Sequence, residues 1–180
     1  MQTDPDEIEQ FWELARNQAR TNPIPGYFPP LSGEALAPPT FAFGGDEEQA
    51  DHLLALVLDG TKTATASARW DYGAGPEGEG ADSGQERTGD EQLPAAGDLA
   101  IVLDGRGHPR ALIEVTEVRV VPFQEVDAEH ARLEGEGDLS LRYWRESHER
   151  FFTEFASHDR GFDPAMPVVL ERFRLLHPRP

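Results

Sequence analysis

Residues 50–65 read ADHLLALVLDGTKTAT and decide how the chain around them folds. The apolar residues of the first half recur at three- and four-residue spacing, which predicts a helix with one apolar face. Asp46 is expected to cap the start of this helix, and Gly60 to end it. The threonines that follow favour a strand from about residue 61 to 69. The apolar face comprises Ala50, Leu53, Leu54, Val57 and Leu58.

The segment Gly60-Thr61-Lys62-Thr63-Ala64-Thr65 places an amine three residues before a hydroxyl group. A lysine whose pKa is lowered by burial can deprotonate a neighbouring hydroxyl, which makes Lys62 and Thr65 candidates for a base and a nucleophile. Residues 62 and 65 of a regular strand point to opposite faces, so their convergence requires Lys62 to lie in the turn before the strand. The alternative is an exposed lysine beside threonines that only favour the strand.

The lysine count singles out the same position. Of the 16 basic residues, Lys62 is the only lysine and the others are arginine. Arginine keeps its proton at any useful pH, whereas lysine can lose it. A lysine retained among arginines therefore indicates that position 62 needs an amine.

The rest of the chain predicts further helices and strands in no repeating order. Helices are expected at residues 5–20, 127–134 and 141–155, and strands at 99–103, 111–121 and 168–176. Between Val115 and Val118 the apolar parity shifts, which predicts a β-bulge. Gly135 and Gly137 are expected to stop the helix that ends at residue 134.

These elements predict a single α+β domain: a small mixed β-barrel flanked by α-helices. Residues 1–40 are expected to add a helix and a proline-rich extended segment that pack on the domain formed by residues 41–180. Residues 73–92 are glycine-rich and acidic, and form a predicted insertion with little to bury.

Composition limits the possible partners. The formal net charge is −18, which disfavours a surface that grips many phosphates. There is no cysteine, and the six histidines show no metal-ligand spacing with acids, so no metal site and no other cofactor is predicted. The sequence has no apolar run of membrane-spanning length and no signal-peptide pattern, which predicts a cytoplasmic protein without a membrane partner.

The order of motifs resembles the ASCH-domain family of the PUA-like group. In its members a helix is followed directly by a Gly-x-Lys-x-x-Thr motif, as in residues 50–65 here. Residues 134–138, EGEGD, followed by Trp144, His148 and the Phe151-Phe152 pair, are similar to one bacterial branch of the family. The resemblance spans roughly residues 40–176 and implies the PUA-like α+β fold.

The resemblance also implies a function. One small member type is an amidohydrolase that removes the acetyl group of N4-acetylcytidine with a Lys, a Thr and a Glu. By position these residues are Lys62, Thr65 and Glu134, although Glu136 and Asp138 lie close to the last. Where that type has an arginine two residues after its threonine, this chain has Ser67. Other members are described as RNA-binding proteins or ribonucleases.

Three further side chains are candidates for substrate binding. Ser67 follows the motif directly, and the rings of Trp70 and Tyr72 can stack on a base or simply pack at the rim. His148 lies on the apolar face of its helix, where a core histidine is the commoner role.

The leading hypothesis is a hydrolase of an acylated nucleoside or similar small amide; the alternative is an RNA-binding module or ribonuclease. The sequence leaves the oligomeric state open.

Overall fold

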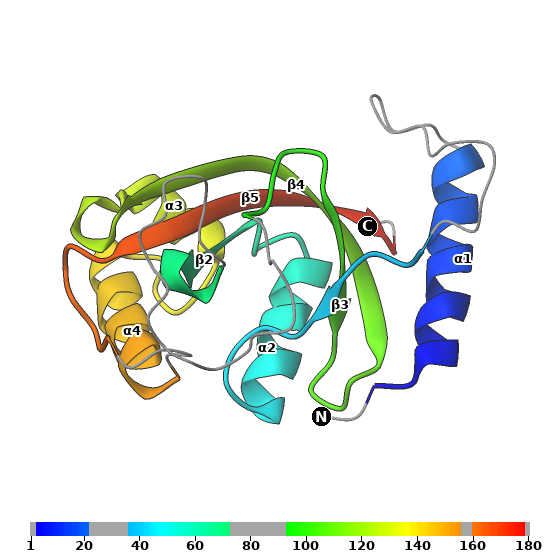
Figure 1. Ribbon diagram of the computed structural model, residues 1–180, viewed down its shortest axis with the longest axis horizontal. Coiled ribbons are helices and arrows are strands. Elements are labelled where there is room, and N and C mark those ends of the chain that lie inside the picture. Colours follow the sequence, from blue (N-terminus) through cyan, green and yellow to red (C-terminus); the bar gives the residue numbers. More distant parts are fainter. Residues whose placement is uncertain (1–2, 22–35, 73–92, 156–159, 179–180) are drawn as a thin grey trace.

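The computed structural model describes residues 3–21, 36–72, 93–155 and 160–178 (Figure 1). Within this part of the chain, four α-helices surround one sheet, and none of them is long and apolar enough to cross a membrane. Most of the proline-rich segment and the predicted insertion at 73–92 lie outside the described residues. The helices are α1 (Pro5–Thr21), α2 (Glu47–Leu58), α3 (Ala128–Glu134) and α4 (Leu141–Glu154).

The sheet is mixed and has the strand order β1-β3-β4-β5-β2. β1 (Thr40–Phe41) runs parallel to β3 (Leu99–Leu103), and every other pairing is antiparallel. β4 (Pro109–Pro122) and β5 (Pro167–His177) form a long curved ladder at its centre (Figure 1). β2 (Ala64–Ala68) pairs with the outer side of β5.

This arrangement confirms the α+β class and corrects one detail of it. In the described part of the chain β1 and β2 are the two edges and do not pair, so the sheet is open rather than a closed barrel. Strand β2 ends after five residues and continues into a 3-10 turn, η1 (Arg69–Asp71), and the opposite edge strand β1 has two residues. The predicted bulge is confirmed by a register shift between Val115 and Glu117.

Helices cover both faces of the sheet because consecutive strand residues point to opposite sides. On β3, Ile101 packs under α1 with Trp12, whereas its neighbour Val102 packs under α2 with Leu53. A third cluster lies beneath α3 and α4, around Trp144. The site described below lies where α2, α3 and α4 meet at β2.

The end of α3 is held against the turn that carries Lys62. Gly135 ends α3 in the left-handed conformation, with φ of 76°. A Cβ atom at this position would lie 2.8 Å from the backbone oxygen of Thr61. The backbone nitrogen of Thr63 donates to the Leu133 oxygen at 2.8 Å, which completes the contact. Any side chain at position 135 would therefore push the two segments apart.

We predict that Gly135→Ala destabilises the protein more than Gly60→Ala. Both glycines have positive φ, but a Cβ at Gly60 would meet no atom within 4 Å. Gly60→Ala should cost about 1–2 kcal/mol for the backbone conformation alone, and Gly135→Ala roughly 1–3 kcal/mol more for the clash. Urea denaturation of both variants measures the difference, and equal losses would contradict the close approach.

Candidate active site

Lys62 lies in the turn between α2 and β2, the position that its side chain needs in order to approach that of Thr65. Its backbone nitrogen donates to the oxygen of Leu56 at 2.9 Å, which folds the turn back onto the end of α2. The side chain is buried, with 2% of its residue surface exposed. This turn, rather than the strand itself, aims the amine under α3 and α4.

Two carboxylates hold the Lys62 amine. Its Nζ donates to Glu134 Oε2 at 3.0 Å and to Glu136 Oε1 at 2.8 Å. A longer contact of 3.4 Å reaches the backbone oxygen of Glu134. The ring of Phe43 lies 5.2 Å from Nζ, a further contact that favours a cation.

The net effect of these contacts is that Lys62 stays protonated. Burial alone would lower the pKa of its amine, but the negative charges of Glu134 and Glu136 outweigh burial and raise that pKa above its ordinary value. The expectation that burial lowers the pKa of Lys62 was therefore wrong, because it took no account of two paired carboxylates. At neutral pH Lys62 is an ammonium ion and not a base.

Glu134 is a fully hydrogen-bonded carboxylate. Oε1 accepts from Trp144 Nε1 at 2.7 Å, and the His130 and His148 Nε2 atoms lie 3.1 and 3.4 Å away. Burial alone would raise the pKa of Glu134, but Lys62, His148 and the hydrogen bond from His130 hold it well below the usual range. A carboxylate in this state orients its neighbours and has no proton to give.

Glu136 provides the second carboxylate, and its side chain is 17% exposed. Sequence reasoning left open whether Glu134, Glu136 or Asp138 belongs to the site. The structure places the first two on Lys62, whereas Asp138 accepts from the backbone of Ser140 on the surface. Two carboxylates therefore flank the one ammonium group of this site.

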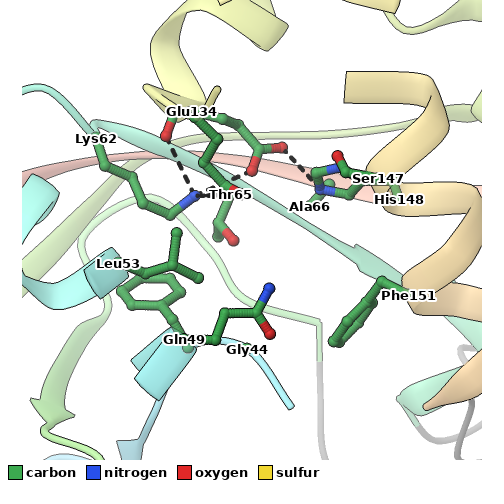
Figure 2. Close-up of a pocket in the computed structure, with 12 residues that line it drawn as sticks. Gly44, Gln49, Leu53, Lys62, Thr65, Ala66, Glu134, Ser147, His148 and Phe151 are labelled. Atoms are coloured by element: carbon green, nitrogen blue, oxygen red, sulfur yellow. Dashed lines mark hydrogen bonds and ion pairs between the residues drawn. The ribbon is translucent and has the colours of Figure 1, made fainter. Parts of the chain in front are cut away.

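A small cavity opens beside the ammonium group, with a volume of about 70 Å³. In Figure 2, Lys62 enters from one side, Glu134 lies above, and the helix α4 brings His148 and Phe151 from the other side. Thr65 faces the same cavity from β2, so the structure brings Lys62, Thr65 and Glu134 together. The other lining residues are Phe43, Gly44, Gln49, Leu53, Ala66, Glu136 and Ser147.

The three predicted substrate-binding side chains lie outside this lining. Ser67 Oγ and the Tyr72 hydroxyl form a hydrogen bond of 2.8 Å just past Thr65 on the chain. Trp70 packs against the core beneath α4, and the guanidinium carbon of Arg160 lies 5.2 Å from the centroid of its ring. Ser67 and Tyr72 thus bond to each other outside the cavity lining, while Trp70 is largely a packing residue.

Sequence reasoning missed the residues that fix Glu134. Trp144 and His148 are one helical turn apart on α4, and their rings stack at 4.2 Å. His130 lies one turn before Glu134 on α3. This i, i+4 spacing is visible in the sequence, but the same spacing is ordinary for core packing, so it could not be read as a polar network.

A second ionisable group lies near the site on β5. Glu171 is paired across the strands with Thr65. Burial and the charge of Asp98 raise the pKa of Glu171 to about 7, against a small opposing effect of a hydrogen bond from Tyr72. In the described residues no group of three histidine or acidic side chains is arranged to hold a metal ion.

We predict that Lys62→Met lowers the free energy of unfolding by roughly 3–5 kcal/mol at pH 8, because it leaves the buried carboxylate of Glu134 and the partly buried carboxylate of Glu136 without their cation. In the wild type Glu134 has a lowered pKa, so its stabilising contribution is lost as the pH falls below about 4.5. In Lys62→Met, burial raises the pKa of Glu134, so Glu134 can take up a proton at pH 5. The stability difference between the wild type and Lys62→Met should therefore be smaller at pH 5 than at pH 8. Urea denaturation of both proteins at pH 5 and pH 8 measures this change.

The matched control is Arg142→Met, which breaks an exposed pair with Asp138 and should cost under about 1 kcal/mol. Adding Glu134→Gln to Lys62→Met should restore part of the stability. A Lys62→Met protein as stable as the control, or one that loses no more stability at pH 8 than at pH 5, would contradict the described ion pairs.

Comparison with known proteins agrees with the fold. Residues 40–177 match the ASCH domain family. Two crystal structures are similar: protein EF3133 from Enterococcus faecalis V583, with 32% identity, covering 94% of this chain and 92% of that one, and an ASCH domain from Lactobacillus crispatus JV V101, with 27% identity, covering 94% of each. Both have a TM-score of 0.69. Comparison with curated proteins gives no significant match. The chain therefore belongs to the ASCH domain family, a PUA-like group.

Proposed function

We propose that this protein hydrolyses an acylated nucleoside or a similar small amide, with N4-acylated cytidine as the leading substrate class. Thr65 is the nucleophile, and the Lys62 ammonium stabilises the oxyanion that forms when Thr65 attacks. The observation that carries the proposal is a buried ammonium ion that shares a small cavity with a hydroxyl group. Glu134 orients the ammonium.

Lys62 has a donor to spare for a substrate. An ammonium group carries three N–H donors. Two are held by carboxylate oxygens at 3.0 and 2.8 Å, but the third meets only the Glu134 carbonyl at 3.4 Å, beyond the usual hydrogen-bond length. An oxyanion is a stronger acceptor than that carbonyl, so this donor is the one that a transition state can recruit.

The cavity size suits an acyl group. A volume of about 70 Å³ is well below the roughly 300–1,000 Å³ of pockets that enclose a whole drug-sized ligand. The apolar walls, Phe43 and Leu53, can contact a methyl group while the carbonyl oxygen faces Lys62. The remainder of the nucleoside would lie outside, along Ser67 and Tyr72, with Trp70 nearby.

The charges favour a neutral substrate over a phosphate chain. Two carboxylates flank the Lys62 ammonium, and six arginines of the described surface are paired with carboxylates. The formal net charge of −18 opposes RNA binding that tracks phosphates. A ribonuclease that used His130 and His148 would need accessible rings, yet His130 is fully buried and both contact Glu134.

The proposed reaction balances as amide plus water to amine plus carboxylic acid. Thr65 Oγ1 loses its proton and bonds to the acyl carbon, and the carbonyl electrons move to the oxygen beside Lys62. Collapse of this intermediate breaks the C–N bond, the leaving nitrogen takes a proton, and an acyl ester remains on Thr65. Water then cleaves the ester and restores the hydroxyl group.

We predict that Thr65→Ala lowers the hydrolysis rate of N4-acetylcytidine at least about 100-fold, because no side-chain hydroxyl remains to accept the acyl group. Thr65→Ser keeps a hydroxyl and should retain most of the activity. Lys62→Arg keeps a positive charge but replaces the compact ammonium by a planar group in a site that is 2% exposed, and should lower the rate about 100- to 1,000-fold. Chromatography of cytidine release gives these rates.

Circular dichroism of each variant checks that it is folded. Full activity in a folded Thr65→Ala protein would remove Thr65 as the nucleophile. A wild type that turns over none of several N4-acylated cytidines, yet binds RNA with an affinity that Lys62→Arg preserves, would replace the hydrolase by a binding module.

A further inference from the structure

The charged groups that line the cavity are largely bonded to one another. Lys62 is protonated, and Glu134 accepts from Lys62, Trp144 and His130. One oxygen of Glu136 is bonded to Lys62 at 2.8 Å. His148 faces Glu134 with Nε2, while its Nδ1 lies 3.0 Å from the Trp144 oxygen. Each of these groups takes part in holding the site together.

Glu171 lies on the strand next to Thr65 and on the same face. The two residues are direct partners in the antiparallel ladder of β2 and β5. Side chains at such positions share one face of the sheet, with their Cβ atoms about 4.5–5.5 Å apart. A glutamate is long enough to span that separation and reach a threonine hydroxyl.

Tyr72 gives independent support for this shared face. Its hydroxyl lies 2.8 Å from Ser67 Oγ, and it also forms a hydrogen bond with Glu171. Ser67 is two residues after Thr65 and therefore points to the same side of β2. Thr65, Ser67, Tyr72 and Glu171 thus form one polar surface that continues outward from the cavity.

The surroundings of Glu171 leave it able to change its protonation state near neutral pH. Burial and the nearby Asp98 raise its pKa to about 7, where a general base is most effective. Its partner on β4 is the uncharged Val118. Glu117 lies 3.4 Å from Arg119 and 3.6 Å from Arg172. The other ionisable groups on the elements around Glu171 are Arg110, Glu114, Glu117 and Arg119 on β4, Arg172, Arg174 and His177 on β5, and Arg69 and Asp71 on η1.

We infer that Glu171 is the general base that takes the proton from Thr65, with Tyr72 holding its carboxyl group and Ser67 holding Tyr72; the inference rests on the proposed role of Thr65 as nucleophile. As the Thr65 oxygen bonds to the acyl carbon, its proton moves to the Glu171 carboxylate. When the tetrahedral intermediate collapses, Glu171 gives this proton to the leaving group. It then accepts a proton from the water that cleaves the acyl ester, and returns that proton to the Thr65 oxygen as the ester breaks.

The test uses p-nitrophenyl acetate, an activated ester that can acylate Thr65 without recognition of a nucleoside. The acetyl group on the full-length protein is followed by intact mass and located by peptide mapping, with Thr65→Ala as the blank. Rates are measured from pH 5 to 9 for the wild type, Glu171→Gln and Glu117→Gln. Glu117 is a carboxylate on the adjacent strand with a side chain that is 45% exposed, and it serves as the matched control.

We predict that the wild-type acetylation rate rises about tenfold per pH unit below a midpoint near 7 and then levels off, as expected for a base with that pKa. Glu171→Gln should slow acetylation at least about 100-fold and remove this pH step, because the amide cannot accept the proton. Glu117→Gln should stay within about twofold of the wild type. Loss of the pH step separates a base from a residue that only supports the fold.

Three results would overturn the inference: Thr65 of the wild type is not acetylated, the wild type shows no step near pH 7, or a folded Glu171→Gln protein keeps the wild-type rate or the step. The first two need no variant. If Thr65 is acetylated through Glu171 but N4-acylated cytidines are not hydrolysed, the inference stands and the proposed substrate class fails.

Discussion

The ammonium group of Lys62, buried between the carboxylates of Glu134 and Glu136, is the interaction on which the site depends. A buried charge is tolerated only when it is paired and hydrogen-bonded. Meeting that condition brings together the turn after α2, the end of α3 and, through Trp144 and His148, the face of α4. Gly135 permits the close approach that this pairing needs. The ion pairs therefore connect three separate segments in one constraint.

The same pairing limits which chemistry each residue can perform. Two carboxylates raise the pKa of Lys62 and thereby make it a source of positive charge rather than a base. Lys62 and the donors around Glu134 in turn hold that carboxyl group ionised, so it serves as an anchor. In the proposed reaction, proton transfer falls to a group outside this cluster, where burial acts without a compensating cation. Glu171 has that environment, since its neighbour Asp98 is an acid. In the proposed reaction Lys62 thus stabilises negative charge, and Glu171 accepts the proton.

Much of the fold could be predicted from local patterns. The apolar spacing and the caps at Asp46 and Gly135 fixed the positions of α2 and α3, because helix boundaries depend on neighbouring residues. The bulge after Val115 was visible as a parity shift. Closure of the sheet was not predictable, since pairing between its edge strands β1 and β2 is a tertiary contact that no local pattern specifies. Lys62 and Thr65 could be named from their motif, and the structure places both at one cavity. The pKa direction of Lys62 could not be predicted, because it depends on Glu134 and Glu136, which lie 72 and 74 residues away in sequence.

The protonation state of Lys62 can be measured directly because the chain contains a single lysine. Protein labelled with ¹⁵N or ¹³C in lysine gives one side-chain signal, with no ambiguity of assignment, and its chemical shift can be followed from pH 6 to pH 11. The account predicts an ammonium signal that persists beyond the ordinary lysine pKa of 10.5, until the protein itself unfolds. A signal that titrates to the neutral amine near pH 7 or 8 in the folded protein would contradict it and restore Lys62 as the base.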